Sequence, residues 1–302
     1  MEFLIGGLSG SLAVCVTNPL EVVKCRYQLQ GELKAKGSYS VHYKNIFHAF
    51  YTIARNDGIL ALQKGLTPSI VYQMILQGCR LGLFQVAQER QWLNKESGNA
   101  SMLKSMAVST VGGCVGGFLS TPFHLIKVHL QAKANESIAV GYQHKHTGVI
   151  SALRDIHSHH GIKSLYRGAS AIVVRIAIAS STQIPTFTIC KEYLKKNEVF
   201  PNPGGAVDTL VAALVGGLVQ VLIMTPFDTV ATRFCNQGVD ANGKGLLYKN
   251  ALDCMIKSAK AEGFFGLYKG LVPCYFRVGP YALLSLTIWD SLKTLQKKYT
   301  SS

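Results

Sequence analysis

Three arginines lie inside long apolar segments of this 302-residue chain, where a permanent charge is costly. Arg175 and Arg277 each follow a motif-ending glycine by seven residues, and the same count from a third such glycine reaches Tyr72. Arg80 lies eight residues past Tyr72, on the same helical face and about 12 Å further along the axis. A guanidinium keeps its proton and offers paired donors that suit carboxylate, sulfate or phosphate. The pattern predicts that the three arginines bind a small anion.

Snorkelling offers another explanation for each arginine, because its stem can lie in lipid while its charge reaches the helix end. That explanation suits one arginine better than three at matched positions. Polar neighbours complete the predicted binding site, which consists of Arg80, Arg175, Arg277, Tyr72, Gln73, Gln77, Ser181 and Gln183. Two or three arginines favour a small dianion over a nucleotide, which would also need a slot for its base.

The composition excludes several classes of protein. The chain has 31 Lys and Arg against 16 Asp and Glu, a formal charge of +15, yet only 16% of its residues are charged and 48% are hydrophobic. Nucleic-acid binders reach such a charge by adding many basic residues, so we expect no nucleic-acid partner. The eight cysteines stand singly, and His157, His159 and His160 lack a partner set, so we expect no metal site. No phosphate-binding loop or nucleophile motif indicates an enzyme.

Two motifs recur three times and divide the chain into repeats. The first motif reads PLEVVKCR, PFHLIKVH and PFDTVATR, beginning at Pro19, Pro122 and Pro226. The second reads DGILALQKG, HGIKSLYRG and EGFFGLYKG, ending at Gly65, Gly168 and Gly270. Because both motifs keep the same register, we expect three repeats of about 100 residues, over 1–98, 99–200 and 201–302.

Each repeat contains two long, mostly apolar segments that predict membrane-spanning helices. The expected spans are 3–29, 66–93, 103–131, 169–195, 206–236 and 271–297. Helices of this length cross an apolar layer of about 30 Å even when tilted. Polar residues within them indicate that one face meets lipid and another lines water. The alternative, a soluble bundle of long helices, explains the apolar composition less well.

The distribution of basic residues predicts how the chain lies in the membrane. Each long connection between the two helices of a repeat carries five Lys or Arg residues. Six crossings place these three connections on one side and both termini on the other. By the positive-inside tendency, the long connections face the negative compartment.

The paired motifs resemble those of the mitochondrial carrier family, solute carrier family 25, over the whole chain. The closest group contains members 34 and 35 and the oxaloacetate carriers. The resemblance implies an all-α membrane protein with six transmembrane helices, threefold pseudosymmetry and short amphipathic matrix helices. It also implies a multi-pass protein of the mitochondrial inner membrane, with both termini toward the intermembrane space, that exchanges solutes by alternating access.

In that family, an acid and a base after each motif proline pair between repeats and form a matrix gate. The equivalent positions are Glu21 and Lys24, His124 and Lys127, and Asp228 and Ala231, braced by Gln28 and Gln131. In the cyclic scheme the missing acid, at His124, and the missing base, at Ala231, are partners of each other. Losing both leaves no orphan charge at membrane depth. The alternative is that His124 only packs. The prolines Pro19, Pro122 and Pro226 are expected to kink their helices.

A second gate on the cytoplasmic side is implied by a further family motif. Its positions are Asp290, Lys293, Lys191, Gln85, Gln88 and Thr188. Only Asp290 and Lys293 fit the motif fully, so this gate should be weak. The alternative for these two is an ordinary surface pair within one helix.

The leading hypothesis is an antiporter of small dicarboxylate or keto-acid anions such as oxaloacetate, malate or malonate, or of sulfate. We expect a monomer without a cofactor, in contact with membrane lipids. The family resemblance suggests that Gly65, Gly168 and Gly270 bind cardiolipin phosphate at helix N-termini. The alternatives are a proton-coupled or uncoupling-type anion carrier, and a degenerate carrier that serves as an inner-membrane interaction protein.

Overall fold

A computed structural model describes residues 2–35, 37–92, 102–197, 206–240 and 243–300. The long helices are α1 (Glu2–Leu29), α3 (Leu66–Glu89), α4 (Met102–Leu119) with α5 (Thr121–Ala132), α7 (Ala169–Lys196), α8 (Ala206–Asn236) and α10 (Leu271–Thr300). The short α-helices are α2 (Ile46–Asp57), α6 (Val149–Leu165) and α9 (Ala251–Glu262). Three 3₁₀ turns, η1 (Ile59–Gln63), η2 (Glu136–Ile138) and η3 (Phe264–Tyr268), complete the described elements. The expected repeat boundaries at 98/99 and 200/201 lie outside the described residues.

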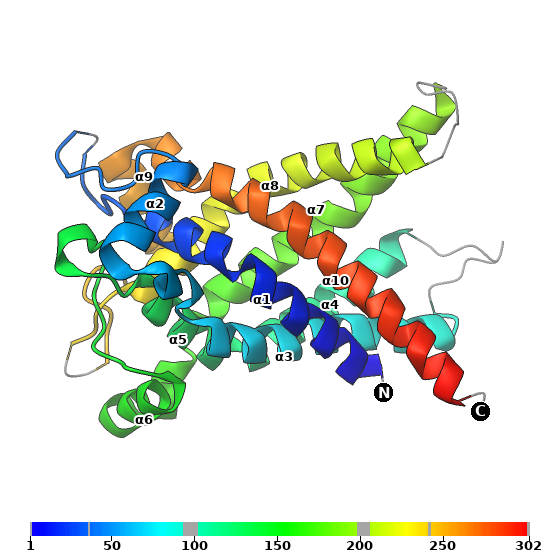
Figure 1. Ribbon diagram of the computed structural model, residues 1–302, viewed down its shortest axis with the longest axis horizontal. Helices are drawn as coiled ribbons and strands as arrows, with labels where there is room; N and C mark the ends of the chain where they lie inside the picture. The colour runs from blue at the N-terminus through cyan, green and yellow to red at the C-terminus, as the bar shows by residue number, and fades with distance from the viewer. Residues whose placement is uncertain (1, 36, 93–101, 198–205, 241–242, 301–302) are drawn as a thin grey trace.

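The long helices form a closed ring in which neighbours in sequence are also neighbours in space. α1 packs against α3, α3 against α4, α4 against α7, α7 against α8, α8 against α10, and α10 against α1. The short helices α2, α6 and α9 lie together at one end of this ring, and the outer ends of α1 and α10 lie at the other (Figure 1). The predicted all-α carrier architecture is therefore confirmed.

The third long helix differs from its expected span, because it breaks at Ser120 into α4 and α5. The two halves are bent by 67°. Pro122 has no amide proton for the Phe118 carbonyl four residues earlier. Beside it, the hydroxyl of Thr121 donates to the Gly117 carbonyl at 2.9 Å. α1 and α8, by contrast, each continue as one helix through Pro19 and Pro226.

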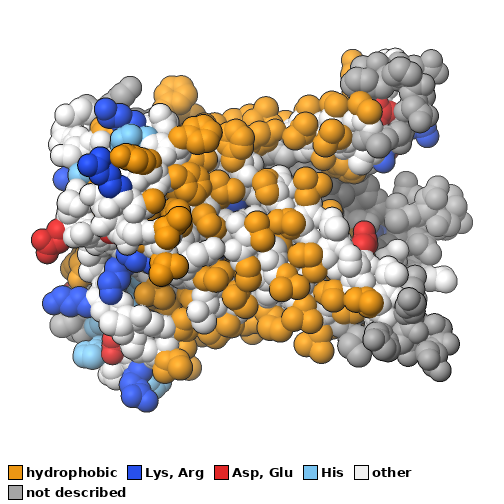
Figure 2. Space-filling model, viewed as in Figure 1, with side chains coloured by type: hydrophobic (Ala, Val, Ile, Leu, Met, Phe, Trp, Pro, Cys, Tyr) orange, Lys and Arg blue, Asp and Glu red, His pale blue; other side chains and the backbone are white. Residues whose placement is uncertain are grey.

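The outer surface is apolar along the length of the long helices. Within the described residues, four helices are long and apolar enough to cross a membrane by themselves, and five if the bent pair counts as one span. Figure 2 shows this hydrophobic band, with Lys and Arg side chains gathered beyond it at the end formed by α2 and α9. α3 is not among these helices, because it contains polar residues such as Gln73, Gln77 and Arg80. These three side chains face the interior of the ring.

Candidate functional site

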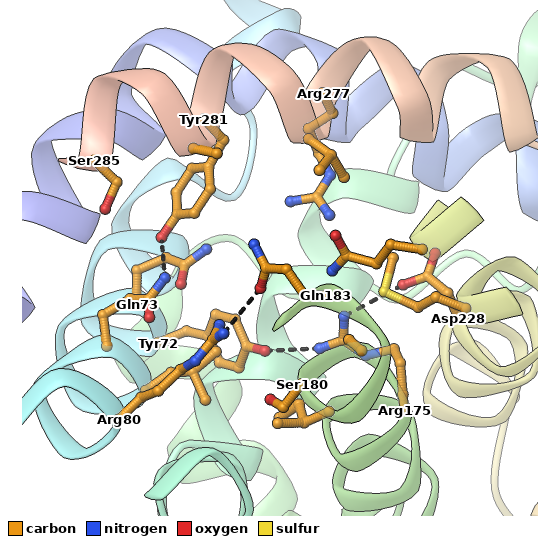
Figure 3. A pocket seen from close by; sticks show the side chains of 18 of the residues that line it. Tyr72, Gln73, Arg80, Arg175, Ser180, Gln183, Asp228, Arg277, Tyr281 and Ser285 are labelled. Atoms are coloured by element: carbon orange, nitrogen blue, oxygen red, sulfur yellow. Dashed lines mark hydrogen bonds and ion pairs between the residues drawn. The ribbon is translucent and has the colours of Figure 1, made fainter. Parts of the chain in front are cut away.

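A cavity of about 340 Å³ lies inside the ring, and every long helix contributes to its wall. Arg80, Arg175 and Arg277 all line it, from α3, α7 and α10 (Figure 3). Sequence positions about 100 and 200 residues apart therefore deliver three cations to one space. This shared cavity is the feature on which the interpretation of the site depends.

Two ion pairs between repeats form the cavity floor. Lys24 Nζ lies 2.6 Å from Asp228 Oδ2, and Lys127 Nζ contacts Glu21 Oε2. The first pair ties α1 to α8 and the second ties α5 to α1, in the cyclic order expected for the matrix gate. Because these carboxylates are nearly inaccessible to solvent, removing either partner would leave a buried charge without compensation.

The third gate position holds no ion pair, as its residue types require. His124 packs edge-on against the ring of Tyr72, with ring centroids 5.0 Å apart, and its Nδ1 lies 4.0 Å from Cys235 Sγ. Ala231 is buried among apolar neighbours of α8 and η3. The two departures from the family pattern thus leave the floor without an orphan charge.

Two of the three arginines contact the same carboxylates that form the floor. Arg175 Nη1 lies 3.4 Å from Asp228 Oδ1, and its Nη2 donates a 2.8 Å hydrogen bond to the Tyr72 hydroxyl. Arg277 Nη1 lies 3.1 Å from Glu21 Oε1. Each acid therefore shares its charge between one lysine of the floor and one arginine of the cavity wall.

Arg80 has neutral partners instead. Its Nε donates to Ser109 Oγ at 3.1 Å, and its Nη2 donates to Gln183 Oε1 at 2.9 Å. Among the described residues, no carboxylate lies within ion-pairing distance of Arg80. An anion can approach this guanidinium without displacing an acid.

The other predicted binding residues divide into those that reach the cavity and one that does not. Tyr72, Gln73, Gln77 and Gln183 line it, and the buried Gln73 Oε1 has no hydrogen-bond partner in the described structure. Ser181 is not among the lining residues; its hydroxyl bonds the carbonyl of Ile178. The helix turns by about 100° per residue, so its neighbour Ser180 faces the cavity in its place.

Several lining residues were missing from the sequence prediction. They are Ser109, Ser180, Gln220, Tyr281 and Ser285. Tyr281 accepts a 2.8 Å hydrogen bond from Gln77 Nε2 and lies one turn beyond Arg277, so its spacing could have revealed it. Ser109 and Gln220 come from α4 and α8, whereas all the predicted binding residues lie on α3, α7 and α10.

The two expected bracing glutamines behave differently. Gln28 Nε2 donates to Asp228 Oδ2 at 2.7 Å and so reinforces the pair with Lys24. Gln131 Nε2 donates instead to Asn18 Oδ1 at 3.1 Å, away from the acids of the floor. The brace therefore reaches only one of the two ion pairs.

The residues of the expected cytoplasmic gate lie outside the cavity lining. Lys191 lies over the ring of Phe187, and Lys293 lies over the ring of Trp289 with its Nζ 4.6 Å from the centroid. Gln85 donates to Glu89 within its own helix, Thr188 is half-buried, and Gln88 and Asp290 are exposed. In this structure the two ion pairs close the cavity at its floor, and the six positions of the expected cytoplasmic gate do not line it.

The three motif glycines have a structural reason of their own. Gly65, Gly168 and Gly270 have φ values of +72°, +111° and +89°, which glycine adopts readily. An added Cβ at these positions would also approach side chains of the neighbouring repeat, Gln131, Cys235 and Gln28, within 3 Å. Their conformation and this close packing account for glycine without a lipid.

Comparison with known proteins agrees with this geometry. The model of the mitochondrial carrier protein family matches three times, over residues 1–95, 98–198 and 202–300. Solute carrier family 25 member 35 of Mus musculus is 46% identical over 299 residues, which cover 99% of each chain. The mitochondrial oxaloacetate transport protein of Saccharomyces cerevisiae is 35% identical, covering 97% of this chain and 89% of its own. The mitochondrial citrate transporter E of Aspergillus niger is 33% identical, with 98% and 93% covered.

These matches run through all three repeats and include the helices that carry the arginines and the floor. They confirm the family that the sequence motifs indicated, as well as the group within it. The chain belongs to the mitochondrial carrier family and is a transporter of small solutes across a mitochondrial membrane.

Proposed function

We propose that this carrier exchanges small dianions across the mitochondrial inner membrane, namely dicarboxylate or keto-acid anions such as oxaloacetate, malate or malonate, or sulfate. The observation that carries the proposal is the convergence of Arg80, Arg175 and Arg277 on one cavity. A dianion satisfies two or three guanidinium groups at once, which a neutral solute does not. The volume of about 340 Å³ is at the lower end of ligand pockets and favours a small ion.

The relatives point in the same direction. Two of them are named for oxaloacetate and citrate, both of which are small carboxylate anions. An anion that meets Arg175 and Arg277 competes with Asp228 and Glu21 for their guanidinium groups. Losing these contacts weakens the hold on both acids, so substrate binding lowers the free-energy cost of opening the floor.

The return step requires a closure on the opposite side of the cavity. Asp290, Lys293 and Lys191 lie on α10 and α7, which must approach each other for these charges to pair. With only three charges among six positions, this gate is the weaker of the two. In this proposal the floor faces the matrix and both termini face the intermembrane space, in keeping with the basic end seen in Figure 2.

The carrier is also expected to act alone and in contact with lipid. It acts as a monomer without a cofactor, and cardiolipin phosphates lie near Gly65, Gly168 and Gly270, where α3, α7 and α10 begin with free backbone amides.

Exchange in liposomes tests this function. The purified chain is reconstituted into vesicles loaded with malate, and uptake of labelled oxaloacetate, malate, malonate, sulfate and ATP is compared. We expect dicarboxylate uptake that requires internal dicarboxylate. Uptake of ATP alone would contradict the substrate class, and equal uptake into empty vesicles would contradict antiport. No uptake of any solute would favour the interaction-protein alternative.

A further inference from the structure

Three histidines of the second repeat meet beneath the membrane-spanning region. His129 lies near the end of α5, and His144 and His146 lie in the connection that leads to α6. One ring nitrogen of each lies within 4.8 Å of the others. The rings stack in parallel, with the centroids of His129 and His144 3.5 Å apart. No metal site was expected from the sequence, because His157, His159 and His160 lack a partner set, whereas folding gathers a different set of histidines.

Each of the three histidines has one ring nitrogen held by an oxygen acceptor. His129 Nε2 donates to the Cys235 carbonyl at 2.9 Å, and His144 Nε2 donates to the Asn236 carbonyl at 3.0 Å. His146 Nδ1 donates to Asp155 Oδ2 at 3.2 Å. In metal-binding imidazoles, an outer N–H bond of this kind fixes the tautomer and leaves the other nitrogen as a ligand. Because the rings of His129 and His144 are stacked, one of them must turn before both nitrogens face one ion.

The second nitrogens are available for such a role. His129 Nδ1 is buried and has no hydrogen-bond partner in the described structure. Within the same described ranges, the second nitrogens of His144 and His146 also lack hydrogen-bond partners.

In the other two repeats, an arginine occupies the position equivalent to His129. Arg26 and Arg233 stand seven residues after their motif prolines, where the second repeat has His129. Arg26 pairs with Asp57 at 2.8 Å, and Arg233 pairs with Glu262 at 2.7 Å. In the second repeat the acid is replaced by His160, so the cross-link between the long helix and the short matrix helix is missing its ion pair.

A cavity of about 160 Å³ lies at this cluster and gives room for a bound ion. It is lined by the three histidines together with Asp155, His159, His160 and Arg167. The positive charge of the Arg167 guanidinium repels a cation in this cavity. The Asp155 carboxylate, bound to His146, supplies the negative charge that offsets it.

We propose that His129, His144 and His146 bind a divalent transition-metal ion of the zinc class, with solvent at the fourth position. Three neutral imidazoles suit zinc, copper or nickel and do not suit calcium or magnesium. The ion replaces the Arg–carboxylate link of the other repeats. Because His129 and His144 also bond carbonyls at the end of α8, it fixes this end of the second repeat to the third.

Thermal unfolding with added Zn²⁺ tests the site. The full chain without a polyhistidine tag is stripped of metal, and its unfolding midpoint in detergent is followed as Zn²⁺ or Mg²⁺ is added. We expect one Zn²⁺ per chain and a midpoint raised by about 5 °C at roughly one hundred times the dissociation constant. Mg²⁺ should leave the midpoint unchanged.

Two variants separate this site from adventitious binding. His146→Gln lies in a connection and should lose at least tenfold in zinc affinity, whereas the control His157→Gln, an exposed position on α6, should match the wild type. A zinc response that survives in His146→Gln, or that disappears in His157→Gln, would overturn the proposal. So would the absence of any response in the wild-type chain.

Discussion

Arg80 differs from Arg175 and Arg277 in the groups that its guanidinium contacts. Arg175 and Arg277, the lower two arginines because they lie next to the floor, contact its acids at 3.4 Å and 3.1 Å. Arg80 contacts a hydroxyl and an amide oxygen instead. Arg80 is also farther from the floor along α3. Arg80 is therefore available to an entering anion, whereas Arg175 and Arg277 are bound to the acids of the gate that the anion must open.

The floor should therefore be the most sensitive part of the cavity. Asp228 contacts Lys24, Arg175 and Gln28, so Asp228→Asn leaves two buried cations without their carboxylate. We expect a loss of about 3–5 kcal/mol in the free energy of unfolding, measured by thermal unfolding in detergent.

Asp253→Asn is the matched control for this substitution, because Asp253 pairs with Lys257 near the surface of α9. It should cost no more than about 1 kcal/mol. Equal losses in the two variants would show that the floor has no special role.

Supplying the missing gate pair tests whether the floor limits transport. His124→Asp introduces an acid and Ala231→Lys a base at the third position of the gate. The double variant should be more stable than the two single changes predict, by a coupling of about 0.5–3 kcal/mol. It should also exchange substrate more slowly than the wild type, because three pairs must open. Strict additivity of the single effects would contradict the cyclic pairing of these positions.

Arg80 should matter for binding more than for stability. Arg80→Lys keeps the positive charge but loses the planar fork, so we expect about tenfold weaker apparent affinity for a dicarboxylate. The unfolding midpoint should move little, since Arg80→Lys strands no carboxylate. Substrate concentration dependence of exchange measures the first effect. A stability loss as large as that of Asp228→Asn would remove the distinction between the upper and lower arginines.

The smallest effect is expected for two adjacent serines. Ser180 lines the cavity and Ser181 bonds a carbonyl of its own helix. Ser180→Ala should change the apparent affinity by a few-fold, whereas Ser181→Ala should leave it at the wild-type value. The reverse order would show that α7 is rotated relative to this structure.

The repeated motifs were sufficient to predict the helices and the grouping of the arginines, because both depend on local spacing that recurs three times. A kink was expected at Pro122, and the helix is bent by 67° there, whereas α1 and α8 continue as single helices through Pro19 and Pro226. This difference was not predicted, because the three prolines occupy the same motif position. The contacts of Arg175 and Arg277 with the floor acids were also missed. They depend on distances between helices, which spacing along one chain does not determine. For the same reason the gathering of His129 with His144 was not foreseen.

The central claim is that three arginines share one dianion, and exchange by single-arginine variants tests it most directly. Labelled malate uptake into malate-loaded vesicles is measured for the wild type and for Arg80→Gln, Arg175→Gln and Arg277→Gln, at equal amounts of folded carrier. We predict that the wild type exchanges malate and that each variant loses at least about tenfold in rate at subsaturating malate. Wild-type rates in all three variants would contradict the account.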